Sequence, residues 1–95
     1  MTTFSKAEIE TELMKINNWQ VSKEGISKKF VFDNFTKAFA FIVEVGFLSE
    51  KQNHHPKIIN EYNKVQLLLF THDENAITHK DFKLAKSIDG LSREK

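Results

Sequence analysis

The segment from Asn34 to Lys51 limits the possible folds more than any other part of the sequence. Its apolar residues recur at helical spacing, and Asn34 is of a residue type favoured at the N-cap of a helix. These apolar residues surround the helix almost completely and leave Glu44 alone on a narrow polar stripe. A helix that packs on one side of a sheet needs only one apolar stripe. The sequence therefore predicts that another subunit buries a second face of this helix.

Strand patterns lie on both sides of this helix, two before it and two after it. The first pair is Trp19 to Val21 and residues 26–32, separated by a glycine turn. The second pair covers residues 57–62 and 65–70. Short segments of alternating hydrophobicity that are joined by turn residues are typical of β-hairpins. We therefore expect two hairpins in one sheet.

Two capping boxes mark the remaining helices. Ser5 with Glu8 opens one helix, and Thr78 with Asp81 opens another. The resulting order, α-β-β-α-β-β-α, predicts a two-layer α+β fold in which a four-stranded antiparallel sheet carries three helices on one face. Residues 1–95 are enough for a single domain with one core.

The composition argues against several classes of protein. The chain has no cysteine and so no disulfide, thiolate nucleophile or thiolate metal site, which fits a cytoplasmic protein. Its formal net charge is only +1, and its one arginine is Arg93. Because arginine is the usual ligand for phosphates and guanine edges, we expect no nucleic-acid partner. No apolar run is long enough to span a membrane, so no membrane partner is expected either.

The histidines gather around the second predicted hairpin. If residues 63 and 64 form a two-residue turn, antiparallel pairing sets His55 opposite His72. Directly opposed residues lie on one face of a sheet with their Cβ atoms about 5 Å apart. His54 would point to the other face of the sheet. Pro56 interrupts the ladder, however, and can turn the side chain of His54 toward His55 and His72. The spacing thus predicts imidazoles grouped at the open end of the hairpin.

Two carboxylates are expected beside these histidines. Glu50 lies four residues before His54, and Asp81 lies in the first turn of the last helix. Imidazoles titrate near neutral pH and carboxylates can orient them, so the pattern favours acid–base chemistry. Two other interpretations stay open, a solvated His-His turn and a three-histidine zinc site with hydrolytic activity. His79 is predicted to be solvated, because a helix dipole disfavours a cation in the first turn.

A wider set of residues matches the pattern of one known family. These residues are Glu50, His54, His55, Pro56, Tyr62, Asn63, Val65, Leu69, Thr71, His72, Thr78, Asp81, Leu84, Ala85, Ile88 and Asp89, with Trp19, Phe30, Phe32, Phe35, Ala38 and Phe39 upstream. With this spacing the chain resembles pterin-4a-carbinolamine dehydratase over nearly its whole length. The most specific part is the block from the His-His-Pro triplet to the Thr-His pair.

The resemblance implies an activity and an assembly. It implies an enzyme without metal or cofactor that converts 4a-hydroxytetrahydropterin to quinonoid dihydropterin and water, recycling the pterin used by an aromatic amino acid hydroxylase. It also implies a homodimer or homotetramer, for which the helix 34–51 is the expected interface. The family's three catalytic histidines correspond to His54, His55 and His72.

The resemblance also implies substrate-binding residues, which flank these histidines in the sequence or lie in the last helix. They are Glu50, Pro56, Thr71, Asp73, Glu74 and Asp81.

The sequence also departs from the family beside the site. Ile58 stands where tryptophan is common, and Ala76-Ile77 replaces a common Gly-Leu pair. We expect these changes to affect the shape of the pocket or the substrate preference while leaving the acid–base residues intact. The rival hypothesis is a non-enzymatic binding module that pairs with a partner protein through the helix 34–51.

Overall fold

The computed structural model describes residues 4–91, so Arg93 lies outside the described residues. The elements in chain order are α1 (Lys6–Leu13), β1 (Gln20–Ser22), β2 (Gly25–Val31), α2 (Phe35–Gln52), β3 (Lys57–Glu61), β4 (Lys64–Leu69), the 3₁₀ helix η1 (His72–Glu74) and α3 (His79–Leu91). The strands form one antiparallel sheet in the order β1-β2-β4-β3. The predicted order of helices and strands is confirmed, and η1 is an addition that the sequence did not predict.

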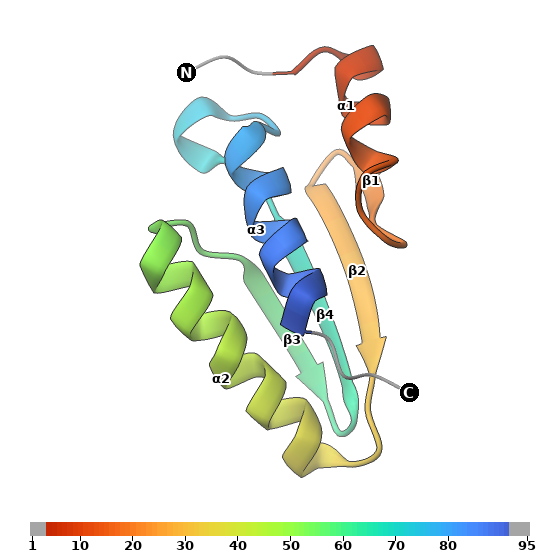
Figure 1. The fold of residues 1–95 in the computed structure, drawn as a ribbon, viewed down its shortest axis with the longest axis vertical. Helices are drawn as coiled ribbons and strands as arrows, with labels where there is room; N and C mark the ends of the chain where they lie inside the picture. The colour runs from red at the N-terminus through yellow and green to blue at the C-terminus, as the bar shows by residue number, and fades with distance from the viewer. Residues whose placement is uncertain (1–3, 92–95) are drawn as a thin grey trace.

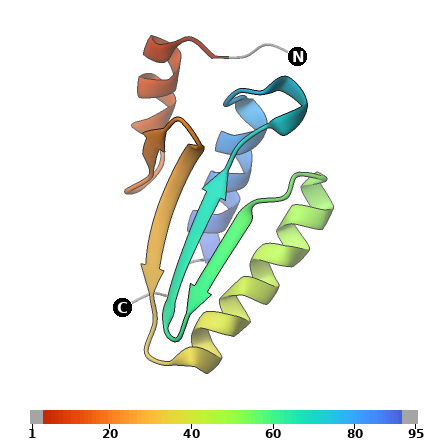
Figure 2. The same cartoon turned by 180° about the vertical axis from the view of Figure 1, so that it is seen from behind.

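The helices lie on one side of the sheet, as predicted (Figure 1). The view from behind shows β2, β4 and β3 with none of the described helices in front of them (Figure 2). One core lies between the two layers. Its fully buried apolar side chains come from both layers and include Ile26, Phe30, Val45, Val65, Leu67, Leu69, Leu84 and Ile88.

The predicted N-caps of the first two helices are confirmed. The Ser5 hydroxyl accepts the Glu8 backbone N–H at 3.1 Å, and the Glu8 carboxylate accepts the Ser5 N–H at 2.7 Å. The Asn34 side-chain oxygen accepts the Lys37 N–H at 2.9 Å. Because such caps satisfy amides that have no partner within the helix, they fix where α1 and α2 begin.

Helix α2 presents two apolar faces, as its sequence predicts. The inner face buries Ala38, Phe41, Val45 and Ser49. The other face is a row of exposed side chains at every fourth residue, Phe35, Phe39, Val43 and Phe47, which we call the outer α2 stripe. Residues spaced by four lie above one another on a helix. The stripe is therefore a continuous apolar surface that the described residues leave uncovered.

The β3–β4 hairpin differs from the predicted register. Glu61 pairs with Lys64, so each residue of β3 faces a partner two positions earlier in β4 than predicted. The ladder also ends at Lys57, and within the described strands no pairing sets His55 opposite His72. The prediction of that opposed pair was wrong. Because the shift is an even number of residues, the faces of the strands are unchanged.

Two asparagines account for this register. The Asn63 amide donates to the Phe32 carbonyl at 2.9 Å, and the Asn63 carbonyl accepts the Phe32 N–H at 2.9 Å. The Asn60 amide donates to the carbonyls of Tyr62 and Lys64 at 3.1 and 2.9 Å. Asn63 is thus held beside the end of β2, and the turn falls on residues 62 and 63, where Tyr62 has a left-handed φ of 52°.

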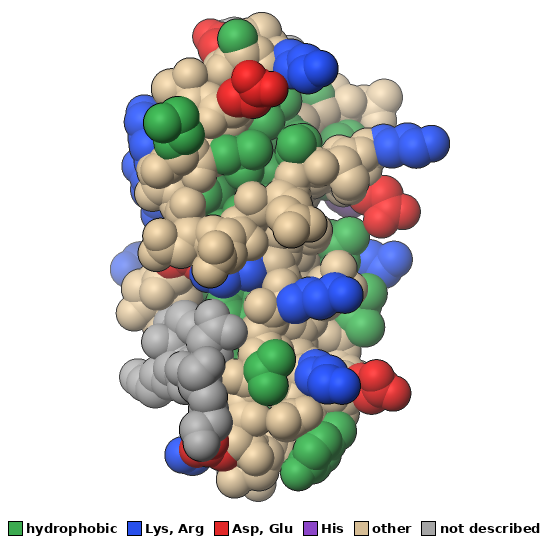
Figure 3. All heavy atoms as spheres, turned by 90° about the vertical axis from the view of Figure 1, so that its right-hand side faces the viewer, with side chains coloured by type: hydrophobic (Ala, Val, Ile, Leu, Met, Phe, Trp, Pro, Cys, Tyr) green, Lys and Arg blue, Asp and Glu red, His purple; other side chains and the backbone are tan. Residues whose placement is uncertain are grey.

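The side of the molecule that carries α1 and β2 has a mixed surface. Lysine and acidic side chains are interspersed there with hydrophobic side chains, some of which adjoin one another in the upper part of the view (Figure 3). This mixture agrees with the small net charge of the sequence. Within residues 4–91, none of the helices combines the length and the apolar character needed to cross a bilayer.

Candidate active site

The end of α2 fixes the position of the two adjacent histidines. Asn53 has a left-handed φ of 51°, and its N–H donates to the Glu50 carbonyl at 3.2 Å. The next N–H, that of His54, donates to the Ser49 carbonyl at 3.0 Å. These two bonds form a Schellman motif, which ends a helix and turns the chain sharply. His54 and His55 therefore leave the helix in a defined direction.

His54 is buried against the carboxylate of Asp81. The distance from His54 Nε2 to Asp81 Oδ1 is 2.6 Å, and Asp81 is fully buried. The second carboxylate oxygen, Oδ2, accepts the Thr71 hydroxyl at 2.9 Å and the Thr78 backbone N–H at 3.0 Å. Asp81 therefore has the predicted capping role at the start of α3 and in addition orients His54. Buried ionised groups are stable only when they are paired in this way.

His55 pairs with a different carboxylate. Its Nε2 lies 2.5 Å from Glu50 Oε2, in the last turn of α2. Both side chains are more than half exposed to solvent. Exposed pairs of this kind add little to stability, so the contact serves mainly to orient the imidazole.

His72 has a third environment. It begins η1 and packs edge-on against Phe70, with the ring centroids 5.1 Å apart. Among residues 4–91, no carboxylate oxygen lies within ion-pair distance of its ring. The backbone around η1 is closed by two hydrogen bonds between Thr71 and Ala76, at 3.0 and 3.3 Å. His72 is thus held by its loop and by an aromatic contact.

These residues surround one polar cavity of about 320 Å³. Its lining comes from the α2–β3 connection, the β4–α3 connection and the start of α3, and consists of Asn53, His54, His55, Phe70, Thr71, His72, Asp73 and Lys80. Both connections lie at the same end of the molecule in Figures 1 and 2. A cavity of this size is at the lower end of the range for small-molecule sites.

The predicted site residues fall into three groups. The three histidines, Thr71 and Asp73 line the cavity. Glu50 and Asp81 contact histidines that line it. Pro56 and Glu74 are not among the lining residues.

Three lining residues were missed by the sequence analysis. Asn53 could have been found as a left-handed helix terminator directly before the two histidines. Phe70 lies two residues before His72, so an extended chain would place both side chains on the same face. Lys80 neighbours Asp81 in the first turn of α3, but no sequence pattern predicts that its side chain reaches the cavity.

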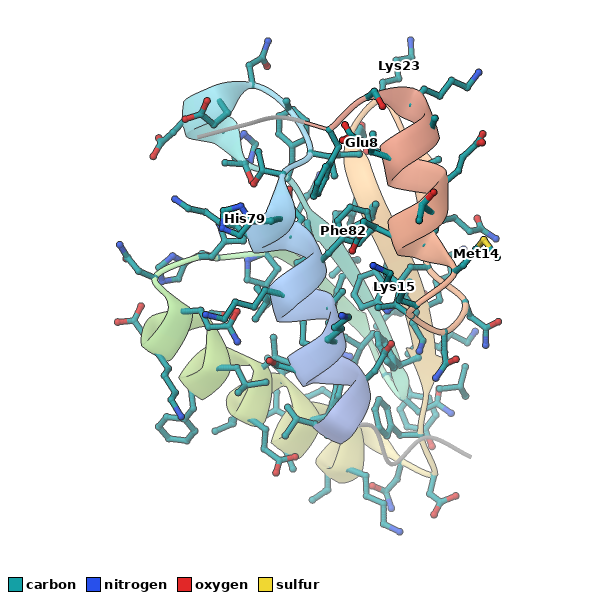
Figure 4. All side chains as sticks on the ribbon, turned by 45° about the horizontal axis from the view of Figure 1, so that its top comes forward. Glu8, Met14, Lys15, Lys23, His79 and Phe82 are labelled. Carbon is teal, nitrogen blue, oxygen red and sulfur yellow. The ribbon has the colours of Figure 1, made fainter. Side chains whose placement is uncertain are left out.

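His79 directly precedes the lining residue Lys80 in α3. His79 is exposed at the first turn of α3, as predicted, and does not line the cavity (Figure 4). Phe82, one turn along α3, is buried instead. Among the described residues, no group of three or more His, Asp or Glu side chains is arranged to hold a metal ion.

Comparison with known proteins identifies the family. The family model described as pterin 4 alpha carbinolamine dehydratase matches residues 2–91. The chain belongs to this family. Relatives named "Putative pterin-4-alpha-carbinolamine dehydratase" in Christiangramia forsetii and Prochlorococcus marinus are 38% and 42% identical over 91 residues. The alignments cover 96% of this chain in both cases, and 94% and 96% of the two relatives.

Solved structures share the dehydratase fold. A transcriptional coactivator/pterin dehydratase from Brucella melitensis superposes with a TM-score of 0.91 at 33% identity, covering 95% of this chain and 98% of that one. A pterin dehydratase-like protein described as a RuBisCO assembly factor in the alpha-carboxysome superposes with a TM-score of 0.66, covering 82% and 90% of the two chains. Its identity is 22%, so that likeness concerns the fold alone.

Proposed function

We propose that this protein dehydrates 4a-hydroxytetrahydropterin to quinonoid dihydropterin and water. The observation that carries the proposal is that three imidazoles from two connections line one cavity and that carboxylates orient two of them. The family assignment supports a pterin as the substrate. The lack of cysteine fits a place of action in the reducing cytoplasm.

The chemistry requires two proton transfers. The bond from C4a to the hydroxyl oxygen breaks, a proton is delivered to the departing hydroxyl, and another proton leaves a ring nitrogen as its electrons form the new double bond to C4a. No electrons leave the substrate, so acids and bases are sufficient. Each positioned acid or base contributes roughly 10²–10⁴-fold to such a reaction.

The contacts of His54 suit it to accept a proton. With Asp81 ionised, the hydrogen in the bond of 2.6 Å belongs to Nε2 of His54, because a carboxylate can only accept. A neutral His54 then keeps a free electron pair on Nδ1. His55 and His72, on the more exposed side of the cavity, are the proposed sources of the proton for the hydroxyl.

The decisive experiment mixes purified protein with chemically generated 4a-hydroxytetrahydropterin and follows dehydration by stopped-flow absorbance. Dehydration no faster than in buffer would remove the proposal and favour the non-enzymatic binding module. Metal analysis of the same sample tests the zinc hypothesis. One zinc per chain, with activity lost on chelation, would replace the proposed mechanism.

We also propose that the protein forms a homodimer or homotetramer through α2. Phe35, Phe39 and Phe47 are 48%, 52% and 73% exposed. At about 150–250 Å² per phenylalanine, the stripe leaves roughly 300–400 Å² of aromatic surface in solvent. A standard interface buries about 800 Å² per partner, so the stripe could supply the centre of one. Light scattering that finds a monomer at micromolar concentration would contradict this part of the proposal.

A further inference from the structure

A buried pair of threonines connects the start of α3 to the candidate active site. Thr78 is fully buried and does not line the cavity, whereas Thr71 lines it. The Thr78 hydroxyl accepts the Lys80 backbone N–H at 3.2 Å and lies 2.8 Å from the Thr71 hydroxyl. The Thr71 hydroxyl in turn donates to Asp81 Oδ2 at 2.9 Å. To cap α3, Thr78 needs only its contact with the Lys80 backbone N–H, so the contacts through Thr71 to Asp81 are additional.

The direction of this chain follows from counting hydrogens. Each threonine hydroxyl carries one hydrogen. Thr71 uses its hydrogen on Asp81, so in the contact between the two threonines Thr78 must be the donor. Hydrogen bonds therefore run from the Lys80 amide through Thr78 and Thr71 to Asp81. The chain ends on Oδ2 and leaves Oδ1 facing His54.

We propose that Thr78 is a positioning residue that acts through Thr71 and Asp81 to hold His54 in its Nε2–H tautomer. The hydrogen bond from the Thr78 hydroxyl occupies an electron pair of the Thr71 oxygen and so directs the Thr71 hydrogen at Oδ2. With this hydrogen and the Thr78 backbone N–H both on Oδ2, the carboxylate cannot rotate away from His54 without leaving buried donors unpaired. His54 then keeps its hydrogen on Nε2 and its electron pair on Nδ1. The inference deepens the proposed function. The expected change in turnover rests on that function, whereas the expected tautomer of His54 does not depend on it.

The test reads the tautomer directly. Long-range ¹H–¹⁵N spectra of the whole protein, recorded where His54 is neutral, distinguish a protonated Nε2 from a protonated Nδ1. We expect pure Nε2–H in the wild type and a mixture of tautomers in Thr78→Val, in which the Thr71 hydroxyl is no longer directed at Asp81. Turnover should fall about 10-fold in this variant, at the lower end of the roughly 10–100-fold loss known for outer partners of metal-ligating histidines. Thr78→Ser should restore both the spectrum and the turnover.

A control separates positioning from helix capping. Asn34→Ala removes the N-cap of α2 but contacts none of these residues, so it should leave the His54 signals unchanged. Should Thr78→Val fail to fold, Thr71→Val interrupts the same chain and keeps the cap of α3. Wild-type protein with hydrogen on Nδ1, a Thr78→Val or Thr71→Val spectrum identical to wild type, or no rescue by serine would each overturn the inference. Correct spectra without dehydratase activity would instead refute the proposed function alone.

Discussion

Replacing Asp81 with asparagine should invert the tautomer of His54 with little change in shape. The new amide has one oxygen and one NH₂ group, so its NH₂ group must take the place of either Oδ1 or Oδ2. On the Oδ2 side it would meet the backbone N–H of Thr78, a donor that cannot become an acceptor. The NH₂ group should therefore face His54, whose Nε2 must then accept. The hydrogen of the neutral ring moves to Nδ1, the atom proposed to take the substrate's proton.

The expected loss of turnover follows from this inversion. A base whose electron pair points away from the substrate forfeits its contribution of roughly 10²–10⁴-fold. In the Ser-His-Asp triad of serine proteases, the corresponding change from aspartate to asparagine lowers kcat about 10⁴-fold for the same reason. We expect kcat to fall by 10²–10⁴, or about 3–5 kcal/mol of transition-state stabilisation. KM should change little, because Asp81 is fully buried and does not line the cavity.

Two measurements check this prediction. Stopped-flow dehydration gives kcat and KM for Asp81→Asn, and ¹⁵N spectra report which ring nitrogen of His54 carries hydrogen. Urea unfolding shows whether the variant is folded, with an expected stability loss of about 1–3 kcal/mol for the weakened buried hydrogen bonds. The reasoning fails if Asp81→Asn keeps wild-type kcat while His54 carries its hydrogen on Nδ1. It also fails if the loss lies entirely in KM.

Three further predictions concern the other histidines, the assembly and the sheet. His55→Ala and His72→Ala should each lower turnover roughly 10²–10⁴-fold, and the double variant should fall further, to the rate that His54 alone supports, measured by the same stopped-flow assay. Phe47→Glu should weaken self-association by at least about 100-fold in light scattering or ultracentrifugation, because a charge would be buried in an apolar interface. Gly25→Ala should cost about 2–4 kcal/mol in urea unfolding, since φ is +121° and a Cβ would lie 2.0 Å from a backbone oxygen of β4.

Each of these predictions has a matched control. His79→Ala should keep wild-type turnover, and greater damage there than at His55 or His72 would contradict the site. Met14→Glu places the same charge on an exposed residue outside the outer α2 stripe and should not change association. Gly46→Ala adds a Cβ that meets nothing within 4 Å inside a helix, so it should be neutral or stabilising by up to about 1 kcal/mol. Equal effects of the two glycine variants would refute the steric argument.

The fold could be predicted because its signals are local. The residues of the capping box, Ser5 and Glu8, are only three positions apart, and the apolar pattern of α2 is visible within the helix itself. The hairpin register could not be predicted in the same way. It depends on the contact between Asn63 and Phe32, which are 31 residues apart. Turn preferences describe only neighbouring residues, so this contact could not be seen from them.

The site shows the same limit. The pair of Glu50 and His55 lies within five residues and was within reach of the spacing alone. His54 and Asp81 are 27 positions apart, and their contact required the packing of α3 against the end of α2. The prediction placed Asp81 near the site but could not specify which histidine it binds. The side chain of Lys80 was missed for a related reason, because helix periodicity does not define what faces the start of α3.

The departures from the family pattern bear on the cavity less than the sequence suggested. Ile58 pairs with Leu67 in the sheet and does not line the cavity, and Ala76 holds η1 closed through its backbone, which most residue types could do. The conformations that place the histidines come instead from Asn53 and Asn75, with left-handed φ values of 51° and 52° at the ends of α2 and η1. Asparagine tolerates this region better than other residues with a side chain. The shape of the site is thus set largely by where the backbone turns.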